Sequence, residues 1–185
     1  MAPSQSLWWS SLESPVTPRA PLTQHLDVDV AIVGGGFTGL WTARELLRRD
    51  PDLRVAVLEK EVCGFGASGR NGGWASGLFP LSNGSVIRRY GRESFDHQRQ
   101  LLQGAVSELG SAARIDGIDA RFIHGGTMTF ARSDVQVARL TDEITAARAI
   151  GIGADDVRWV DETDLEAHVD GALGATYSPH CARID

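Results

Sequence analysis

The chain has 185 residues, of which 42% are hydrophobic and 23% are charged, and its formal net charge at pH 7 is −6. This length and composition indicate a globular protein of one or two domains, and the acidic balance argues against nucleic acid or an anionic membrane as its main partner. No apolar run approaches the length that spans a bilayer, and the N-terminus has neither the basic region nor the apolar core of a secretory signal, so we expect a cytoplasmic protein.

Residues 1–26 are rich in Ser, Pro and Thr, which indicates a poorly ordered N-terminal arm. Trp8 and Trp9 stand within this arm, and two indole rings are unfavourable to leave in water. We therefore expect the arm to dock on another part of the protein.

A strand–helix–strand pattern follows the arm. Apolar runs predict one strand at residues 28–33 and a second, parallel strand at 53–58 that is covered on both faces. Residues 37–49 between them have helical periodicity. This helix is expected to end at Asp50, because the residue before a proline avoids the helical region.

The turn after the first strand carries the pattern G-x-G-x-x-G at Gly34, Gly36 and Gly39. The first glycine permits a tight turn, the second lets a pyrophosphate approach the backbone, and the third lets the helix pack closely on the strand. Glu59 ends the second strand, where its carboxylate can bind ribose hydroxyls and repels the 2′-phosphate of NADP. In this context the pattern predicts a dinucleotide site rather than a chance glycine turn.

The next stretch, residues 63–77, is dense in glycine and has neither strand nor helix periodicity. Ser68 and the neighbouring N–H groups can bind phosphate oxygens, and Arg70 can face phosphate or an electron-rich ring. The alternative is a flexible surface loop. We favour a ligand-binding loop, because a linker rarely holds Arg, Asn and Trp in such a dense glycine frame.

Residues 83–85 (Asn-Gly-Ser) are expected to form a turn, and residues 93–115 a long helix. The apolar residues that share one face of this helix are Phe95, Leu102, Val106, Leu109 and Ala113. Its charged side is expected to be solvated and comprises Arg92, Glu93, Asp96 and Arg99.

The character of the chain changes after Gly117. Residues 120–123 and 127–131 read as strands around Gly125 and Gly126, which predicts a β-hairpin. Further helices are expected at 134–150 and 161–167, and further strands at 157–160 and 172–177. Because this block does not repeat the glycine fingerprint, we interpret it as the start of a second, ligand-covering domain.

Cys63 and Cys181 suit a reducing compartment and do not suggest a disulfide framework. No Cys/His cluster has zinc spacing, so no metal site is predicted, and no Ser-His-Asp or Cys-His pattern stands out. The histidines are expected to be structural or surface residues rather than catalytic bases: His25, His97, His124, His168 and His180.

The run at residues 64–73, together with the glycines at 34–39 and Glu59, resembles the FAD-dependent oxidoreductases of the D-amino-acid oxidase and glycine oxidase superfamily. The Trp8-Trp9 arm and the Arg-Asn-Gly-Gly-Trp run resemble the gamma-glutamylputrescine oxidase branch. The resemblance implies an α/β fold, with a Rossmann-like FAD-binding domain (a parallel sheet with helices) followed by the start of a mixed-sheet substrate domain.

The resemblance also implies domain boundaries and a cofactor site. The arm at 1–26 would precede the first part of the FAD domain at 27–117, then the start of the substrate domain at 118–177 and a return towards the FAD domain at 178–185. Arg70 and Asn71 stand where some relatives carry a covalent flavin link, which implies non-covalent FAD. The residues expected to bind FAD are Gly34, Gly36, Phe37, Thr38, Gly39, Glu59, Lys60, Gly66, Ala67, Ser68, Arg70, Asn71, Gly72 and Gly73.

The implied reaction is oxidation of the C–N bond of a small primary or secondary amine, such as an amino acid or a gamma-glutamylputrescine-like compound. A hydride would pass to the flavin, the imine would hydrolyse, and oxygen or another electron acceptor would then reoxidise the flavin. No catalytic residue can be named from the sequence.

Family chains continue well beyond the length seen here, so the sequence is expected to be an N-terminal fragment that is inactive alone and exposes a sheet edge. Two other functions stay open: an NAD-binding dehydrogenase with the same strand–helix–strand unit, and a non-catalytic fragment.

Overall fold

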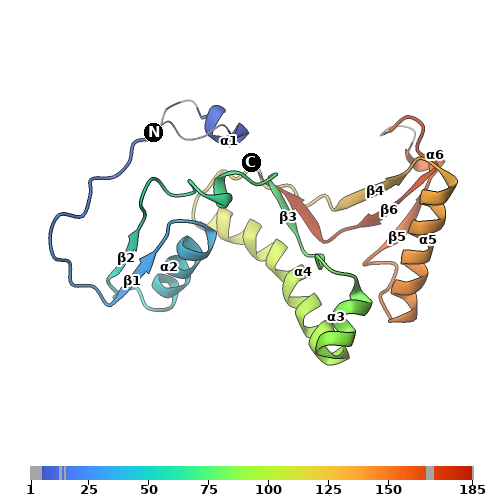
Figure 1. Ribbon diagram of the computed structural model, residues 1–185, viewed down its shortest axis with the longest axis horizontal. Helices are drawn as coiled ribbons and strands as arrows, with labels where there is room; N and C mark the ends of the chain where they lie inside the picture. The colour runs from blue at the N-terminus through green and yellow to red at the C-terminus, as the bar shows by residue number, and fades with distance from the viewer. Residues whose placement is uncertain (1–5, 13, 15, 166–168, 185) are drawn as a thin grey trace. The chain divides into compact units, whose positions relative to one another are not determined.

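The computed structural model describes residues 6–12, 14, 16–165 and 169–184 (Figure 1). The chain forms two compact units, Met1–Gly72 and Gly73–Asp185. The predicted domain ranges 27–117 and 118–177 stay predictions. In the described part of the chain, even the longest helix is too polar to cross a membrane, and no other helix has the length and apolarity to do so.

The first unit contains the predicted strand–helix–strand pattern. Its elements are α1 (Leu7–Ser10), β1 (Val30–Val33), α2 (Phe37–Arg49), β2 (Val55–Leu58) and the 3₁₀ helix η1 (Ala67–Gly69). β1 and β2 pair in parallel, from Val30 opposite Val55 to Val33 opposite Leu58, and α2 contacts both strands (Figure 1). Parallel pairing places the carboxyl ends of both strands at one edge of the sheet, next to the glycine turn.

β2 is half-buried in this unit rather than covered on both faces as its sequence predicts. Its last residue, Leu58, is 38% exposed, and Val33 at the end of β1 is 87% exposed. The reason is that the sheet of this unit has two strands, and α2 packs beside them with Leu40 and Leu47 still partly open to solvent.

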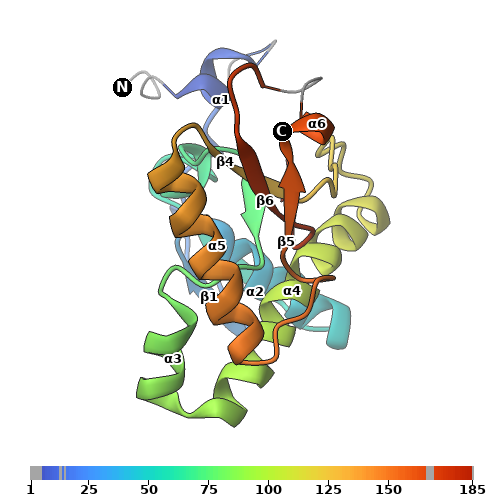
Figure 2. The same cartoon turned by 90° about the vertical axis from the view of Figure 1, so that its right-hand side faces the viewer.

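The second unit contains four helices among its described residues: α3 (Asn83–Tyr90), α4 (Arg92–Ile115), α5 (Asp134–Ala149) and α6 (Glu162–Leu165). Its strands are β3 (Trp74–Ser76), β4 (Thr127–Ala131), β5 (Arg158–Asp161), β6 (Gly174–Ser178) and β7 (Cys181–Arg183). β3 pairs antiparallel with β7, and α4 contacts both of these strands. The other three strands form an antiparallel sheet in the order β4-β6-β5, and α5 contacts all of them (Figure 2).

Two apolar clusters hold the second unit together. The first joins the helices through Val86, Phe95, Ala147 and Ile152, with the ring of Phe79 stacked 5.3 Å from that of Phe95. The second joins α6 to strands β5 and β6 and consists of Val160, Leu165, Ala172 and Ala175. The predicted apolar face of α4 is confirmed at three positions, because Phe95, Val106 and Ala113 are buried.

The predicted hairpin is wrong. β4 pairs with β6, from Thr127 opposite Ser178 to Ala131 opposite Gly174, rather than with residues 120–123. Ile123 instead forms an isolated bridge with Arg183 on β7. A short alternating run indicates extended backbone but does not identify its partner, which here comes from a distant part of the chain.

Two further local predictions are wrong. Residues 83–85 form the first turn of α3, because Ser82 caps the helix by accepting a hydrogen bond from the Ser85 N–H. Asn, Gly and Ser are common both in turns and at helix starts, so this pattern is ambiguous. The stretch 63–77 contains η1 and β3, although it was expected to lack regular structure. In the remaining block, residues 166 and 167, which end the predicted helix at 161–167, lie outside the described residues, and so does His168.

Candidate functional site

The glycine corner between β1 and α2, residues 34–39, is shaped by close backbone contact. Gly34 has a φ of 102°, in the left-handed region that favours glycine, and its N–H donates to the carbonyl of Leu58 on β2. A Cβ on Gly39 would collide with the carbonyl oxygen of Gly34. Only a glycine at 39 therefore lets α2 start so close to the end of β1.

The carboxylate of Glu59 lies against this corner. Its Oε2 accepts a hydrogen bond from the Gly35 N–H at 2.7 Å, and its Oε1 accepts one from the Glu61 N–H at 3.0 Å. The backbone bonds from Glu61 and Gly35 lower the pKa of Glu59, so the side chain is ionised at neutral pH. A carboxylate offers about four lone-pair directions, which leaves acceptor capacity for ligand hydroxyls.

The loop at residues 66–72, here called the glycine loop, contacts the same corner through Ser68. The Ser68 hydroxyl accepts a hydrogen bond from the Phe37 N–H at 2.9 Å, the first helical residue of α2. A Cβ on Gly36 would lie 3.0 Å from that hydroxyl oxygen. Asn71 stabilises the loop, because its side-chain amide donates to the Ser68 carbonyl at 2.7 Å.

The N-terminal arm docks on the glycine loop, as its two tryptophans predict. The indole N–H of Trp8 donates to the Asn71 carbonyl at 2.6 Å, and the Ser6 hydroxyl donates to the Gly69 carbonyl at 2.7 Å.

The structure gathers most of the predicted cofactor residues in the first unit. These are Gly34, Gly36, Phe37, Thr38, Gly39, Glu59, Lys60, Gly66, Ala67, Ser68, Arg70, Asn71 and Gly72. Gly73 begins the second unit, where its carbonyl accepts from the Ile184 N–H. The guanidinium of Arg70 lies 5.1 Å from the centroid of the Phe65 ring, within the same segment of chain.

Sequence reasoning missed the part played by Gly35 and Cys63. Gly35 is buried, and its carbonyl accepts from the Gly64 N–H at 2.9 Å. A Cβ on Gly35 would lie 2.8 Å from the Cys63 sulfur, which is a free thiol. The sequence did carry a signal for this packing, because the middle residue of the Gly34-Gly35-Gly36 run is glycine at a position where the fingerprint does not require one.

This arrangement fits a dinucleotide. The N-terminus of α2 offers N–H groups and the positive end of the helix dipole to a diphosphate. The space where a Cβ would stand on Gly34, Gly66 or Gly72 has no atom within 4 Å, so the backbone there can be approached closely. Glu59 supplies the hydroxyl acceptor beside the same corner. Among the described residues, no three His, Cys, Asp or Glu side chains are grouped to hold a metal ion.

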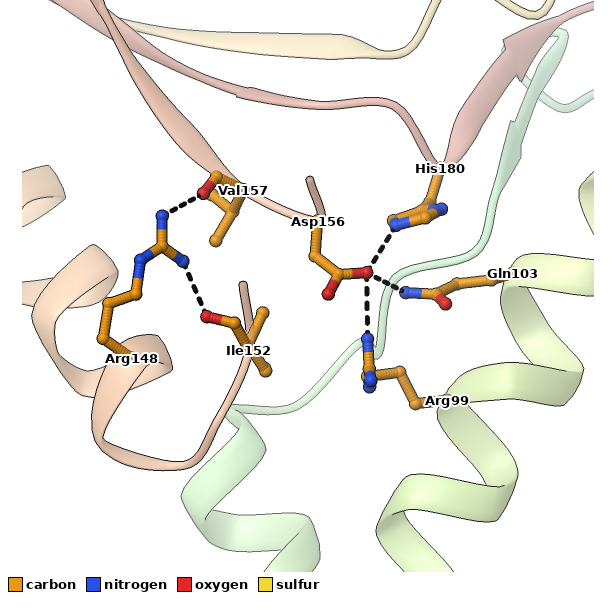
Figure 3. Close-up of polar contacts among 7 residues, drawn as sticks. All are labelled: Arg99, Gln103, Arg148, Ile152, Asp156, Val157 and His180. Carbon is orange, nitrogen blue, oxygen red and sulfur yellow. Dashed lines mark hydrogen bonds and ion pairs between the residues drawn. The ribbon is translucent and has the colours of Figure 1, made fainter. Parts of the chain in front are cut away.

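A separate polar cluster lies in the second unit and is centred on Asp156 (Figure 3). One oxygen, Oδ1, is within hydrogen-bond distance of Arg99 Nη1 at 2.9 Å, Gln103 Nε2 at 3.1 Å and His180 Nε2 at 2.8 Å. Burial raises the pKa of Asp156, but the bond with His180, the charge of Arg99 and the bond from Gln103 outweigh it, so the pKa lies below its ordinary value. The prediction of a solvated Arg99 is therefore wrong.

The Asp156 cluster is a structural link between α4, the segment before β5 and the β6–β7 turn (Figure 3). On the far side of that segment, Arg148 of α5 donates to the carbonyls of Ile152 and Val157. His180 has a structural environment here, in line with the expectation for the histidines.

The sequence matches the family described as FAD dependent oxidoreductase (DAO) over residues 29–185. Gamma-glutamylputrescine oxidoreductase of Escherichia coli is 31% identical over 147 residues, covering 77% of this chain and 33% of that protein. The mitochondrial L-2-hydroxyglutarate dehydrogenase of Caenorhabditis briggsae is 30% identical over 161 residues, covering 85% of this chain and 33% of that protein. The crystal structure of glycine oxidase from Geobacillus kaustophilus superposes with a TM-score of 0.59 at 29% identity, covering 85% of this chain and 40% of that one. The chain spans about a third of the length of the curated relatives it matches.

Proposed function

The chain belongs to the DAO family of FAD-dependent oxidoreductases, and we propose that the protein oxidises the C–N bond of a small primary or secondary amine. The observation that carries the proposal is the gathering of Glu59, the glycine corner and the glycine loop around the N-terminus of α2. The similarity to gamma-glutamylputrescine oxidoreductase supports an amine as the substrate class.

In this proposal each group in the site has a role in holding FAD without a covalent link. The N–H groups of Gly36 and Thr38 bind the diphosphate, since they lie at a helix N-terminus, whereas those of Gly34, Gly35 and Phe37 already donate within the protein. Glu59 accepts hydrogen bonds from ribose hydroxyls with the lone pairs that Gly35 and Glu61 leave free. Gly66 and Gly72 of the glycine loop carry the remaining contacts, because a Cβ at either position would have no atom within 4 Å and a flat ring system can approach the backbone there.

When bound, FAD supplies the acceptor for a hydride from the carbon that carries the amine. The residues of this chain contribute binding and orientation, and the described residues offer no group to which we assign a proton transfer. Oxygen as the electron acceptor and a cytoplasmic location stay predictions.

A second candidate is oxidation of the C–O bond of a hydroxy acid. It is favoured by the match to L-2-hydroxyglutarate dehydrogenase, which covers as much of this chain as any relative described above. The two candidates use the same cofactor site and differ only in the substrate.

Anaerobic spectroscopy of the purified protein separates these functions. We expect a yellow protein whose flavin absorption is bleached by glycine or gamma-glutamylputrescine and not by L-2-hydroxyglutarate. The reverse pattern would establish the hydroxy-acid function. A folded protein that binds NADH in place of FAD would contradict the proposal, and retained flavin that no substrate bleaches would support a non-catalytic role.

A further inference from the structure

The N-terminal segment Ser6–Trp9 contacts the glycine loop at two carbonyl groups. The Ser6 hydroxyl donates to the Gly69 carbonyl at 2.7 Å, and the Trp8 indole N–H donates to the Asn71 carbonyl at 2.6 Å. Both contacts join residues 63 positions apart in the sequence. Trp9 packs on the same loop, since its Nε1 would be 2.9 Å from a Cβ on Gly69.

Ser6 has two roles in this contact. Its hydroxyl accepts a hydrogen bond from the Trp9 N–H and thereby caps α1, while the same hydroxyl donates to Gly69. A helix of four residues has no stability of its own in water. The order of α1 and its docking on the glycine loop are therefore linked.

The contacts continue from the arm to the glycine corner. Asn71 accepts from Trp8 through its carbonyl and donates to the Ser68 carbonyl through its side-chain amide. The Ser68 hydroxyl then accepts from the Phe37 N–H at the start of α2. The arm is thus connected through two residues to the helix end at which the diphosphate is proposed to bind.

The loop needs such support because of its composition. Five of the ten residues 64–73 are glycine, and glycine loses more conformational freedom on ordering than any other residue. A ligand that must order this loop itself would bind more weakly than one that meets it already ordered. The bonds from Ser6 and Trp8 end on carbonyl oxygens of the loop, so these two bonds do not occupy the N–H groups that phosphate requires.

We propose that the Ser6–Trp9 segment is a clamp that orders the glycine loop for FAD, with Ser6 and Trp8 as positioning residues. The proposal rests on the proposed cofactor site. It assigns a function to the arm that the strand–helix–strand fingerprint does not require.

The test uses Ser6→Ala, Trp8→Phe and the double variant, with Ser10→Ala as the matched control. Trp8→Phe keeps an aromatic ring and removes the indole donor. Ser10→Ala removes a hydroxyl of the same helix that bonds only to the Leu7 carbonyl within α1. Each lost hydrogen bond is expected to weaken FAD binding roughly three- to tenfold in a fluorescence titration of the apoprotein, and the double variant more than either.

Amide hydrogen exchange of the apoprotein supplies a second measurement that does not depend on flavin. We expect faster exchange at residues 66–72 in the three clamp variants than in Ser10→Ala, with unchanged exchange in β1 and β2. FAD affinity and loop exchange equal to those of Ser10→Ala, or tighter FAD binding in Trp8→Phe, would overturn the clamp. Failure of the wild-type protein to bind FAD would instead refute the proposed function, while the exchange comparison would still decide whether the arm orders the loop.

Discussion

Replacing Gly39 by alanine tests the packing that shapes the glycine corner. The added Cβ would collide with the Gly34 carbonyl oxygen and lie 3.3 Å from Cγ2 of Ile32. The nearest atom belongs to the backbone, so no side-chain rotation relieves the contact and α2 must shift away from β1. Overpacking of this kind costs about 3 kcal/mol at the upper end of its usual range.

Alanine also favours the helix by about 1 kcal/mol over glycine, so the expected net loss in the free energy of unfolding is about 2 kcal/mol. The matched control is Gly104→Ala in α4, where a Cβ would have no atom within 4 Å. That variant should gain about 0.5–1 kcal/mol. Urea unfolding followed by circular dichroism measures both. If Gly39→Ala were as stable as Gly104→Ala, the close approach of α2 to the turn would be refuted.

The remaining predictions concern one site residue and two structural ones. Glu59→Gln should lower FAD affinity roughly tenfold in a titration. The folded pKa of Glu59 lies below its ordinary value, so its carboxylate should stabilise the folded protein at neutral pH, and this contribution should be lost as the pH falls through the lowered pKa. The variant should lack this acid dependence of the free energy of unfolding. Asp156→Ala should lower the free energy of unfolding in urea by about 2–3 kcal/mol, since three side chains lose their shared acceptor. The control Asp96→Ala, which breaks an exposed ion pair, should change it by about 0.5 kcal/mol. Equal effects of the two substitutions would contradict the structural role of the Asp156 cluster. Gly174→Ala should lower the free energy of unfolding by about 3 kcal/mol and with it the thermal midpoint, because residue 174 has a φ of 152° and an added Cβ would meet the Trp159 ring. An unchanged midpoint would refute that packing.

The parts of the fold that could be predicted from the sequence depend on local rules. β1, α2 and β2 follow from apolar runs, a helical period and a proline stop, all within a short stretch of chain. The glycine fingerprint was recognisable because each glycine answers a specific steric demand, which the contact between positions 39 and 34 illustrates.

The parts that could not be predicted depend on pairing between distant residues. Nothing within residues 120–131 shows that β4 pairs with β6 or that Ile123 bridges Arg183. The three donors to Asp156 likewise come from separate segments. A charged helix face and a lone histidine are commonly solvated, so only the folded chain shows that they meet.

The same division applies to the candidate site. Glu59 and Ser68 were predicted as ligand-binding residues from their positions in motifs. Their bonds to the Gly35 and Phe37 N–H groups join the two motifs, and these depend on how the glycine loop folds back onto the corner. The docking of the arm was expected from its tryptophans, but its partner, the glycine loop, was not.

The most direct measurement is amide hydrogen exchange of the protein with and without FAD. If the glycine corner and glycine loop bind the cofactor, FAD should slow exchange at residues 34–40 and 66–73, and Glu59→Gln should reduce this protection. Stoichiometric FAD binding that protects other residues and leaves these two segments unchanged would contradict the assignment of the site.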